Sequence, residues 1–162
     1  MSLQLRSLVP AELELLHRLI LELGASDGVA QVLTTPQALH DALFGKEPAA
    51  FARLILHDER VAGFVLFSWR WGTFTGTQDL YLNAIYVSPE FRRLGLARAA
   101  MAQLARIAVE RGSTRMEWLT VRDKAQSQDF YESIGSQPAE HMQVRRLQGD
   151  ALNRLAAQVH AT

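Results

Sequence analysis

The chain has 162 residues, and 48% of them are hydrophobic, so a single domain can bury a sizeable core. Seventeen basic and 17 acidic residues give zero formal net charge, which disfavours a nucleic-acid partner. The sequence has no cysteine, which excludes disulfides, thiolate metal sites and a cysteine nucleophile and fits a reducing compartment.

The N-terminal residues lack the basic and apolar regions of a signal peptide, and no apolar run approaches the ~18 residues of a membrane span. We therefore expect a cytoplasmic protein without membrane contact. The five histidines do not stand at metal-ligand spacing, so no metal site is expected.

The first quarter of the chain predicts one strand and two helices. Residues 4–9 alternate as a strand does, and an amphipathic helix follows from Pro10 until Gly24 ends it. An irregular segment at 25–34 precedes a second helix at 35–44, where a threonine cap and a proline mark the start.

A hairpin is expected next, with strands at 50–58 and 61–71 joined by a tight turn at 58–60. The second of these strands is apolar on both alternating sets of positions. It should therefore lie in the centre of a sheet that is covered on both faces.

The middle of the chain predicts a crossover unit, because strand 80–87, loop 88–95, a long helix ending at Gly112 and strand 115–121 follow one another. A turn at 72–79 precedes it.

The C-terminal part predicts a short helix at 123–134, a last strand at 137–147 and a terminal helix at 151–159. The whole order indicates an α/β fold with a mixed, mostly antiparallel central sheet and helices on both faces. No linker divides the chain, so residues 1–162 are expected to form one domain.

The loop at 92–97 carries the pattern R-x-x-G-x-A directly before the long helix. A helix start leaves about four backbone N–H groups without intrahelical partners, at the positive end of the helix dipole. Gly95 permits close approach of a ligand, and neighbouring arginines add positive charge. These features indicate a phosphate site, but for this pattern alone a well-started helix with three solvated arginines is the favoured interpretation. The absence of G-x-G-x-x-G and P-loop patterns disfavours a dinucleotide or a nucleoside triphosphate.

Residues 85–97 resemble the acetyl-CoA signature of the Gcn5-related N-acetyltransferases (GNAT), Q/R-x-x-G-x-G/A after an apolar strand ending in V-x-P. Residues 130–135, F-Y-E-S-I-G, resemble the second landmark of that family, F-Y-x-x-x-G. Within the family, Thr73-Phe74 with Gly76 and the L-Y-L at 80–82 are most similar to the diamine (spermidine/spermine) acetyltransferase group. The resemblance covers nearly the whole chain and implies the GNAT fold with acetyl-CoA as co-substrate.

The resemblance also implies direct transfer of the acetyl group to a primary amine of a small, diamine-like or amino-acid-like molecule. Tyr131 is then the expected catalytic acid, although a tyrosine at this place could instead pack in the core. The expected cofactor-binding residues are Ile85, Tyr86, Val87, Arg92, Arg93, Leu94, Gly95, Leu96, Ala97, Arg98 and Ser127. The backbone of the first three would pair with the pantetheine arm, and the helix start would hold the diphosphate.

The chain departs from the diamine group where that group has an acidic pair after L-Y-L, because Asn83 and Ala84 stand there. An asparagine can position a water but cannot accept a proton, so no base is assigned. Three carboxylates could replace the pair if they lie close in space: Asp27, Asp79 and Glu117. The expected substrate-binding residues are Asp27, Trp71, Phe74 and Asn83, with ordinary core or sheet packing as the alternative for the two aromatic residues.

A non-catalytic acetyl-CoA-binding regulatory domain is the alternative function, because the acidic pair is missing. A protein acetyltransferase is less favoured, since no acidic run is present to form an acceptor groove. The resemblance also implies a homodimer.

Overall fold

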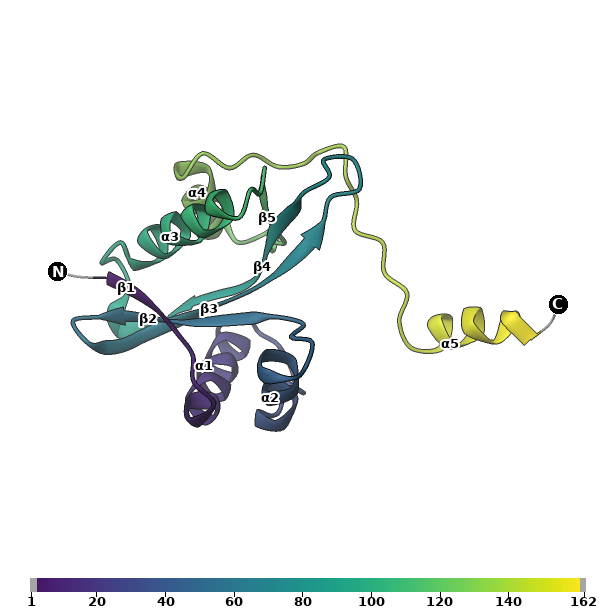
Figure 1. Ribbon diagram of the computed structural model, residues 1–162, viewed down its shortest axis with the longest axis horizontal. Helices are drawn as coiled ribbons and strands as arrows, with labels where there is room; N and C mark the ends of the chain where they lie inside the picture. Colours follow the sequence, from purple (N-terminus) through teal and green to yellow (C-terminus); the bar gives the residue numbers. More distant parts are fainter. Residues whose placement is uncertain (1–2, 161–162) are drawn as a thin grey trace. The chain divides into compact units, whose positions relative to one another are not determined.

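The computed structural model describes residues 3–160 and contains two compact units, one up to Val121 and one from Arg122 onward (Figure 1). Each unit is described by itself. A single domain over residues 1–162 stays a prediction.

The first unit is built on a five-stranded sheet in the order β1-β2-β3-β4-β5. Neighbouring strands are antiparallel from β1 to β4, and only β4 and β5 run parallel. The strands are β1 (Leu3–Ser7), β2 (Phe51–His57), β3 (Arg60–Trp71), β4 (Gln78–Val87) and β5 (Met116–Trp118). The predicted mixed, mostly antiparallel sheet is confirmed, and β3 is its central strand as expected.

Helices cover both faces of this sheet, with α1 (Leu13–Ser26) and α2 (Pro36–Phe44) on one face and α3 (Leu96–Glu110) on the other (Figure 1). Short 3-10 turns, η1 (Pro10–Glu12) and η2 (Pro89–Phe91), precede α1 and α3. Leucines at helical spacing explain the packing of α1, because its buried side chains include Leu13, Leu16 and Leu19.

The core beneath α1 and α2 is formed by alternate residues of the central strands. Leu54, Phe64 and Tyr86 are buried there together with leucines of both helices. Successive side chains of a strand point to opposite faces, so the neighbouring residues Ile55 and Val65, also buried, lie on the α3 face.

Two local features shape the strands. Asp58 and Glu59 have positive φ angles of 45° and 66°, the twist that a two-residue hairpin turn requires between β2 and β3. In β4 the register with β3 passes from Leu66↔Ala84 to Phe67↔Leu82, so Asn83 is an extra, bulged residue.

The second unit contains α4 (Ala125–Ser133), α5 (Asp150–Ala157) and the 3-10 turn η3 (Gln158–His160). The predicted strand at 137–147 is wrong, because this segment is irregular and side chains such as Met142 and Val144 are exposed. Alternation of apolar residues produces a strand only where a partner edge satisfies the backbone N–H and C=O groups. In the first unit, the strand expected at 115–121 shortens to the three residues of β5 for the same reason.

Candidate functional site

β4 and β5 form a fork. They pair only at Leu80↔Met116, Tyr81↔Glu117 and Leu82↔Trp118, so pairing with β5 stops immediately before the bulge at Asn83. Residues 85–87 continue to pair with β3 on their other side. This part of β4 therefore presents a backbone edge that an extended ligand can use as a further strand.

The loop that leaves β4 enters α3 through two residues in the left-handed region, Arg93 at φ 63° and Gly95 at φ 76°. Gly95 is the N-cap of α3, and Ala99 N donates the first helical hydrogen bond to Gly95 O at 3.0 Å. The N–H groups of Leu96 and Ala97 lie ahead of that bond, so the helix itself supplies no acceptor for them. Such a helix start is suited to bind an anion, as the sequence predicted.

Gly95 is required by its backbone angle and not by crowding, because a Cβ built at this position would meet no atom within 4 Å. A side chain at this φ would strain the loop. The space beside Gly95 is therefore open to a ligand.

Two contacts hold the loop against the sheet. Arg92 Nε donates to Val87 O at 3.2 Å, which ties the loop to the end of β4. Phe91 is buried, and the Arg60 guanidinium lies 4.8 Å from the centre of its ring. The loop before α3 and the open edge of β4 are thus directly adjacent.

The side chain of Tyr86 points to the face of the sheet that α1 covers, so only the backbone of Tyr86 belongs to the open edge of β4. Tyr86 Oη donates to Glu22 Oε2 at 3.1 Å, and Ser88 Oγ lies 3.5 Å from the same oxygen. Burial raises the pKa of the Tyr86 hydroxyl, and the hydrogen bond and negative charge of Glu22 raise this pKa further. The contact fastens α1 to β4.

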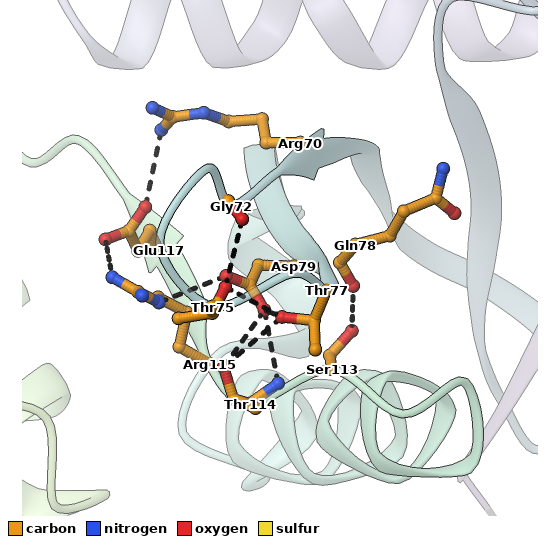
Figure 2. Close-up of polar contacts among 10 residues, drawn as sticks. All are labelled: Arg70, Gly72, Thr75, Thr77, Gln78, Asp79, Ser113, Thr114, Arg115 and Glu117. Atoms are coloured by element: carbon orange, nitrogen blue, oxygen red, sulfur yellow. Dashed lines mark hydrogen bonds and ion pairs between the residues drawn. The ribbon is translucent and has the colours of Figure 1, made fainter.

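At the other end of β4, Asp79 is buried, with 5% of its surface exposed (Figure 2). Its Oδ1 accepts from Thr77 Oγ1 at 2.9 Å and from Thr114 N at 3.1 Å, while Arg115 Nε lies 3.1 Å from Oδ2. Burial opposes ionisation, but the hydrogen bonds from both threonines and the charge of Arg115 outweigh it and lower the pKa of Asp79. A carboxylate held in this way serves the structure and is a poor proton acceptor.

A chain of charges extends from Asp79 to the surface. Arg115 lies 3.7 Å from one oxygen of Glu117, and Arg70 lies 3.4 Å from the other. The Arg70 guanidinium also stands 4.9 Å from the centre of the Tyr81 ring. In Figure 2, Arg70 lies on the side of the strands away from Ser113 and Thr114.

The other expected substrate residues of the first unit lie at three places: the β3–β4 hairpin, the end of α1 and the bulge of β4. Trp71 is 66% exposed and Phe74 is fully exposed at the β3–β4 hairpin, so neither packs in the core, and Trp71 is the last residue of strand β3. Asp27 is the exposed C-cap of α1. Asn83 is exposed at the bulge of β4, next to the fork.

In the second unit, Ser127 and Tyr131 lie on α4. Tyr131 is half-buried, and its ring centre is 5.2 Å from that of Phe130. Gly135, at φ 88°, ends the helix, and Ser136 N and Oγ both donate to Tyr131 O. The F-Y-x-x-x-G pattern thus forms the last turn and the stop of α4.

Sequence reasoning missed Arg70 and Arg115, which pair with the carboxylates of Glu117 and Asp79, and Glu22, which accepts the hydrogen bond of Tyr86. The available signal was weak, because Arg70 and Asp79 flank a turn at symmetrical positions but could have belonged to any exposed hairpin. Within residues 3–160, no group of three His, Asp or Glu side chains is placed to hold a metal ion. No helix in that part of the chain has the length and apolar character needed to cross a membrane.

Comparisons with known proteins agree with this geometry. A model of the acetyltransferase (GNAT) family matches residues 18–135. The chain is 34% identical over 100 residues to L-ornithine N5-acetyltransferase of Arabidopsis thaliana, a match covering 62% of this chain and 44% of that enzyme. It is 28% identical over 159 residues to thialysine N-epsilon-acetyltransferase of Caenorhabditis elegans, covering 96% and 98% of the two chains.

Among solved structures, an integron cassette protein from the mobile metagenome of V. cholerae has the same fold, with a TM-score of 0.79 at 22% identity and coverage of 96% and 98%. The chain belongs to the GNAT acetyltransferase family, as the sequence patterns predicted, and is an acetyl-CoA-dependent N-acetyltransferase.

Proposed function

We propose that this enzyme transfers the acetyl group of acetyl-CoA directly to a primary amine of a small, diamine-like or amino-acid-like molecule. The observation that carries the proposal is the fork between β4 and β5, with the helix-start loop beside it. Two relatives support the acceptor class, because they are named for L-ornithine and thialysine, amino acids that bear a second amine.

The loop and the edge suit two different parts of coenzyme A. The N–H groups at the start of α3, with Arg92, Arg93 and Arg98 nearby, would hold the diphosphate. The backbone of residues 85–87 would hydrogen-bond the extended pantetheine arm as a neighbouring strand does. Both are backbone sites, so affinity would depend on their conformation more than on side-chain identity.

The adjacency of the two sites also gives the arm a direction. Arg92 joins the loop to Val87 O, so an arm that begins at the loop runs along β4 toward Asn83. The distance from Val87 to Asn83 is about 13 Å at an extended rise of about 3.3 Å per residue. The reacting end would therefore lie at the fork.

Acetyl-CoA supplies the thioester whose carbonyl carbon the amine attacks. Direct transfer needs no covalent intermediate, which suits a chain without a cysteine nucleophile. As the carbon–nitrogen bond forms and the carbon–sulfur bond breaks, Tyr131 Oη would donate a proton to the departing sulfur, and the proton that the amine loses would pass to solvent water. Ser127 would add a cofactor contact. Asn83 would orient the amine or a water by hydrogen bonding, and Asp79 would not act as the base because its oxygens are occupied.

We further propose that the protein is a cytoplasmic homodimer. Support for self-association comes from exposed apolar side chains in the second unit, which are Met142, Val144, Leu147, Leu152, Leu155 and Val159. Sedimentation at several protein concentrations tests this, and a monomer at all of them would contradict it.

The activity is tested by measuring thiol release from acetyl-CoA with putrescine, spermidine, L-ornithine and L-lysine as acceptors. We expect release with at least one amine, and a kcat about 100- to 1,000-fold lower for Tyr131→Phe with coenzyme A affinity retained. Glu132→Gln, an exposed neighbour on α4, is the control and should keep the wild-type rate.

Two results would contradict parts of the proposal. Coenzyme A binding without release for any amine would favour the non-catalytic, regulatory alternative. An undiminished rate for Tyr131→Phe would remove Tyr131 as the acid while leaving the transferase activity in place.

A further inference from the structure

Arg70 and Glu117 form the exposed end of the chain of charges and lie on the face of the sheet opposite to α3, near the fork. Residues of β3 alternate between faces, so Arg70 shares the face of Phe64, which packs under α1 and α2, and lies opposite to α3. Arg70 and Glu117 are nevertheless 58% and 42% exposed, so α1 and α2 do not cover them. An amine that approaches the fork from this face meets these two side chains.

The distance between the charges and the fork suits a short aliphatic chain. Glu117 pairs with Tyr81, and Tyr81 precedes the bulged Asn83 by two residues. Two residues of extended strand span about 7 Å. The α-carbon and the terminal nitrogen of ornithine or lysine are four or five bonds apart, so such an acceptor can extend over a length of this order.

The two side chains also keep capacity for a ligand. A guanidinium has five N–H donors, and among the residues described that of Arg70 donates one hydrogen bond, to Glu117. The guanidinium lies over the Tyr81 ring, 4.9 Å from its centre, and its planar fork suits recognition of a planar carboxylate. Glu117 is oriented by Arg70 on one oxygen and Arg115 on the other, and Arg115 is itself anchored by buried Asp79.

We infer that Arg70 and Glu117 select an acceptor with an α-amino acid head, Arg70 binding its carboxylate and Glu117 its α-ammonium group. The ω-amine of the same molecule then lies at the fork. This inference rests on the proposed function, and it assigns an acceptor class and two specificity-determining residues to the open face.

Three acceptor amines test the proposed contacts of Arg70 and Glu117 separately. L-Ornithine carries both head groups, 5-aminopentanoate carries only the carboxylate, and putrescine carries only a second ammonium group. The wild-type kcat/KM should be highest for L-ornithine. Arg70→Gln should lower kcat/KM about 10- to 100-fold for L-ornithine and 5-aminopentanoate and leave putrescine within about threefold.

Glu117→Gln should give the complementary pattern. It should lower kcat/KM for L-ornithine and putrescine about 10-fold or more and leave 5-aminopentanoate nearly unchanged. The matched control is Arg106→Gln, which breaks an exposed pair with Glu110 at 3.5 Å on α3 and should change none of the three values.

Calorimetric titration of the same amines, with coenzyme A present, gives a second measurement that does not need turnover. Equal wild-type kcat/KM or affinity for L-ornithine and putrescine, or variants that affect all three amines equally, would overturn the inference. If no amine is acetylated, the proposed function fails, and the calorimetric preference still decides whether Arg70 and Glu117 bind an amino acid head.

Discussion

The two ends of β4 differ in what they offer a ligand. At the C-terminal end, residues 85–87 and the helix-start loop present backbone N–H and C=O groups, and the nearby side chains either point away, as Tyr86 does, or lie exposed around the loop. In the N-terminal half, residues 80–82 are paired on both sides, and the chemistry lies in the side chains of Arg70, Asp79 and Glu117.

This difference matches the two tasks that we propose for the strand. A site that binds one invariant cofactor can be made from backbone, because every sequence supplies the same N–H and C=O groups. A site that selects one acceptor among many amines needs charges in particular places. The two ends should therefore respond differently to substitution.

The largest expected effect comes from Gly95→Glu, which strains the left-handed N-cap and puts a negative charge beside the proposed diphosphate site. We expect coenzyme A affinity, measured by calorimetry, to fall about 100-fold, which is about 2.7 kcal/mol.

Gly112→Glu is the matched control, because Gly112 also has a positive φ of 81° and open space around it but lies beyond the other end of α3. It should lower stability and leave the affinity for coenzyme A unchanged. Equal affinity losses in both variants would show that Gly95 acts only through general stability.

A second substitution, Asp79→Asn, tests the N-terminal end of β4, where the side chains carry the chemistry. It removes the charge that anchors Arg115 and weakens the hydrogen bonds from Thr77 and Thr114, so we expect the free energy of unfolding in urea to fall by about 2 kcal/mol. Coenzyme A affinity should stay within about threefold of wild type. A large loss of that affinity would mean that the two ends of β4 are not independent.

The pH dependence of stability also tests whether the ionised carboxylate of Asp79 stabilises the fold. The folded pKa of Asp79 is lowered, so its ionised form contributes stability that is complete above the unfolded pKa of about 3.9. This contribution is lost as the pH falls through the lower folded pKa. Urea unfolding between pH 3 and pH 6 should therefore show a smaller loss of stability toward acid for Asp79→Asn than for the wild type, and parallel curves would contradict the assignment.

The smallest effect is expected for Tyr86→Phe. This variant removes the hydrogen bond to Glu22 but keeps the backbone of β4, so the free energy of unfolding should fall by about 1 kcal/mol. Coenzyme A affinity should not change. A fall in that affinity would show that the cofactor end of β4 also depends on a side chain.

Patterns in the sequence predicted most of the first unit correctly because each has a local cause. Pro36 and the Thr35 cap start α2, with Ala38 N donating to Thr35 Oγ1 at 3.1 Å. The two-sided apolar pattern of residues 61–71 predicted the central strand. The pattern at 92–97 predicted a loop that turns directly into a helix, and the structure has Gly95 as the N-cap of α3, with a φ of 76°.

The failures have a common origin. Residues 137–147 alternate like a strand, but a strand also needs an edge with which to pair, and the sequence does not say whether one is available. The same limit applied to the carboxylates. Asp79 and Glu117 could not be sorted into a buried structural group and an exposed one until their partners were known.

The amino-acid sequence by itself determined the helix starts, the central strand and the loop for which we propose diphosphate binding, because backbone angles and apolar spacing are set by nearby residues. Only the tertiary structure decided where β4 and β5 separate and which charged side chains gather in the paired half of β4. Arg70, Asp79 and Glu117 are far apart along the chain, and their contacts exist only because β3, β4 and β5 bring them together.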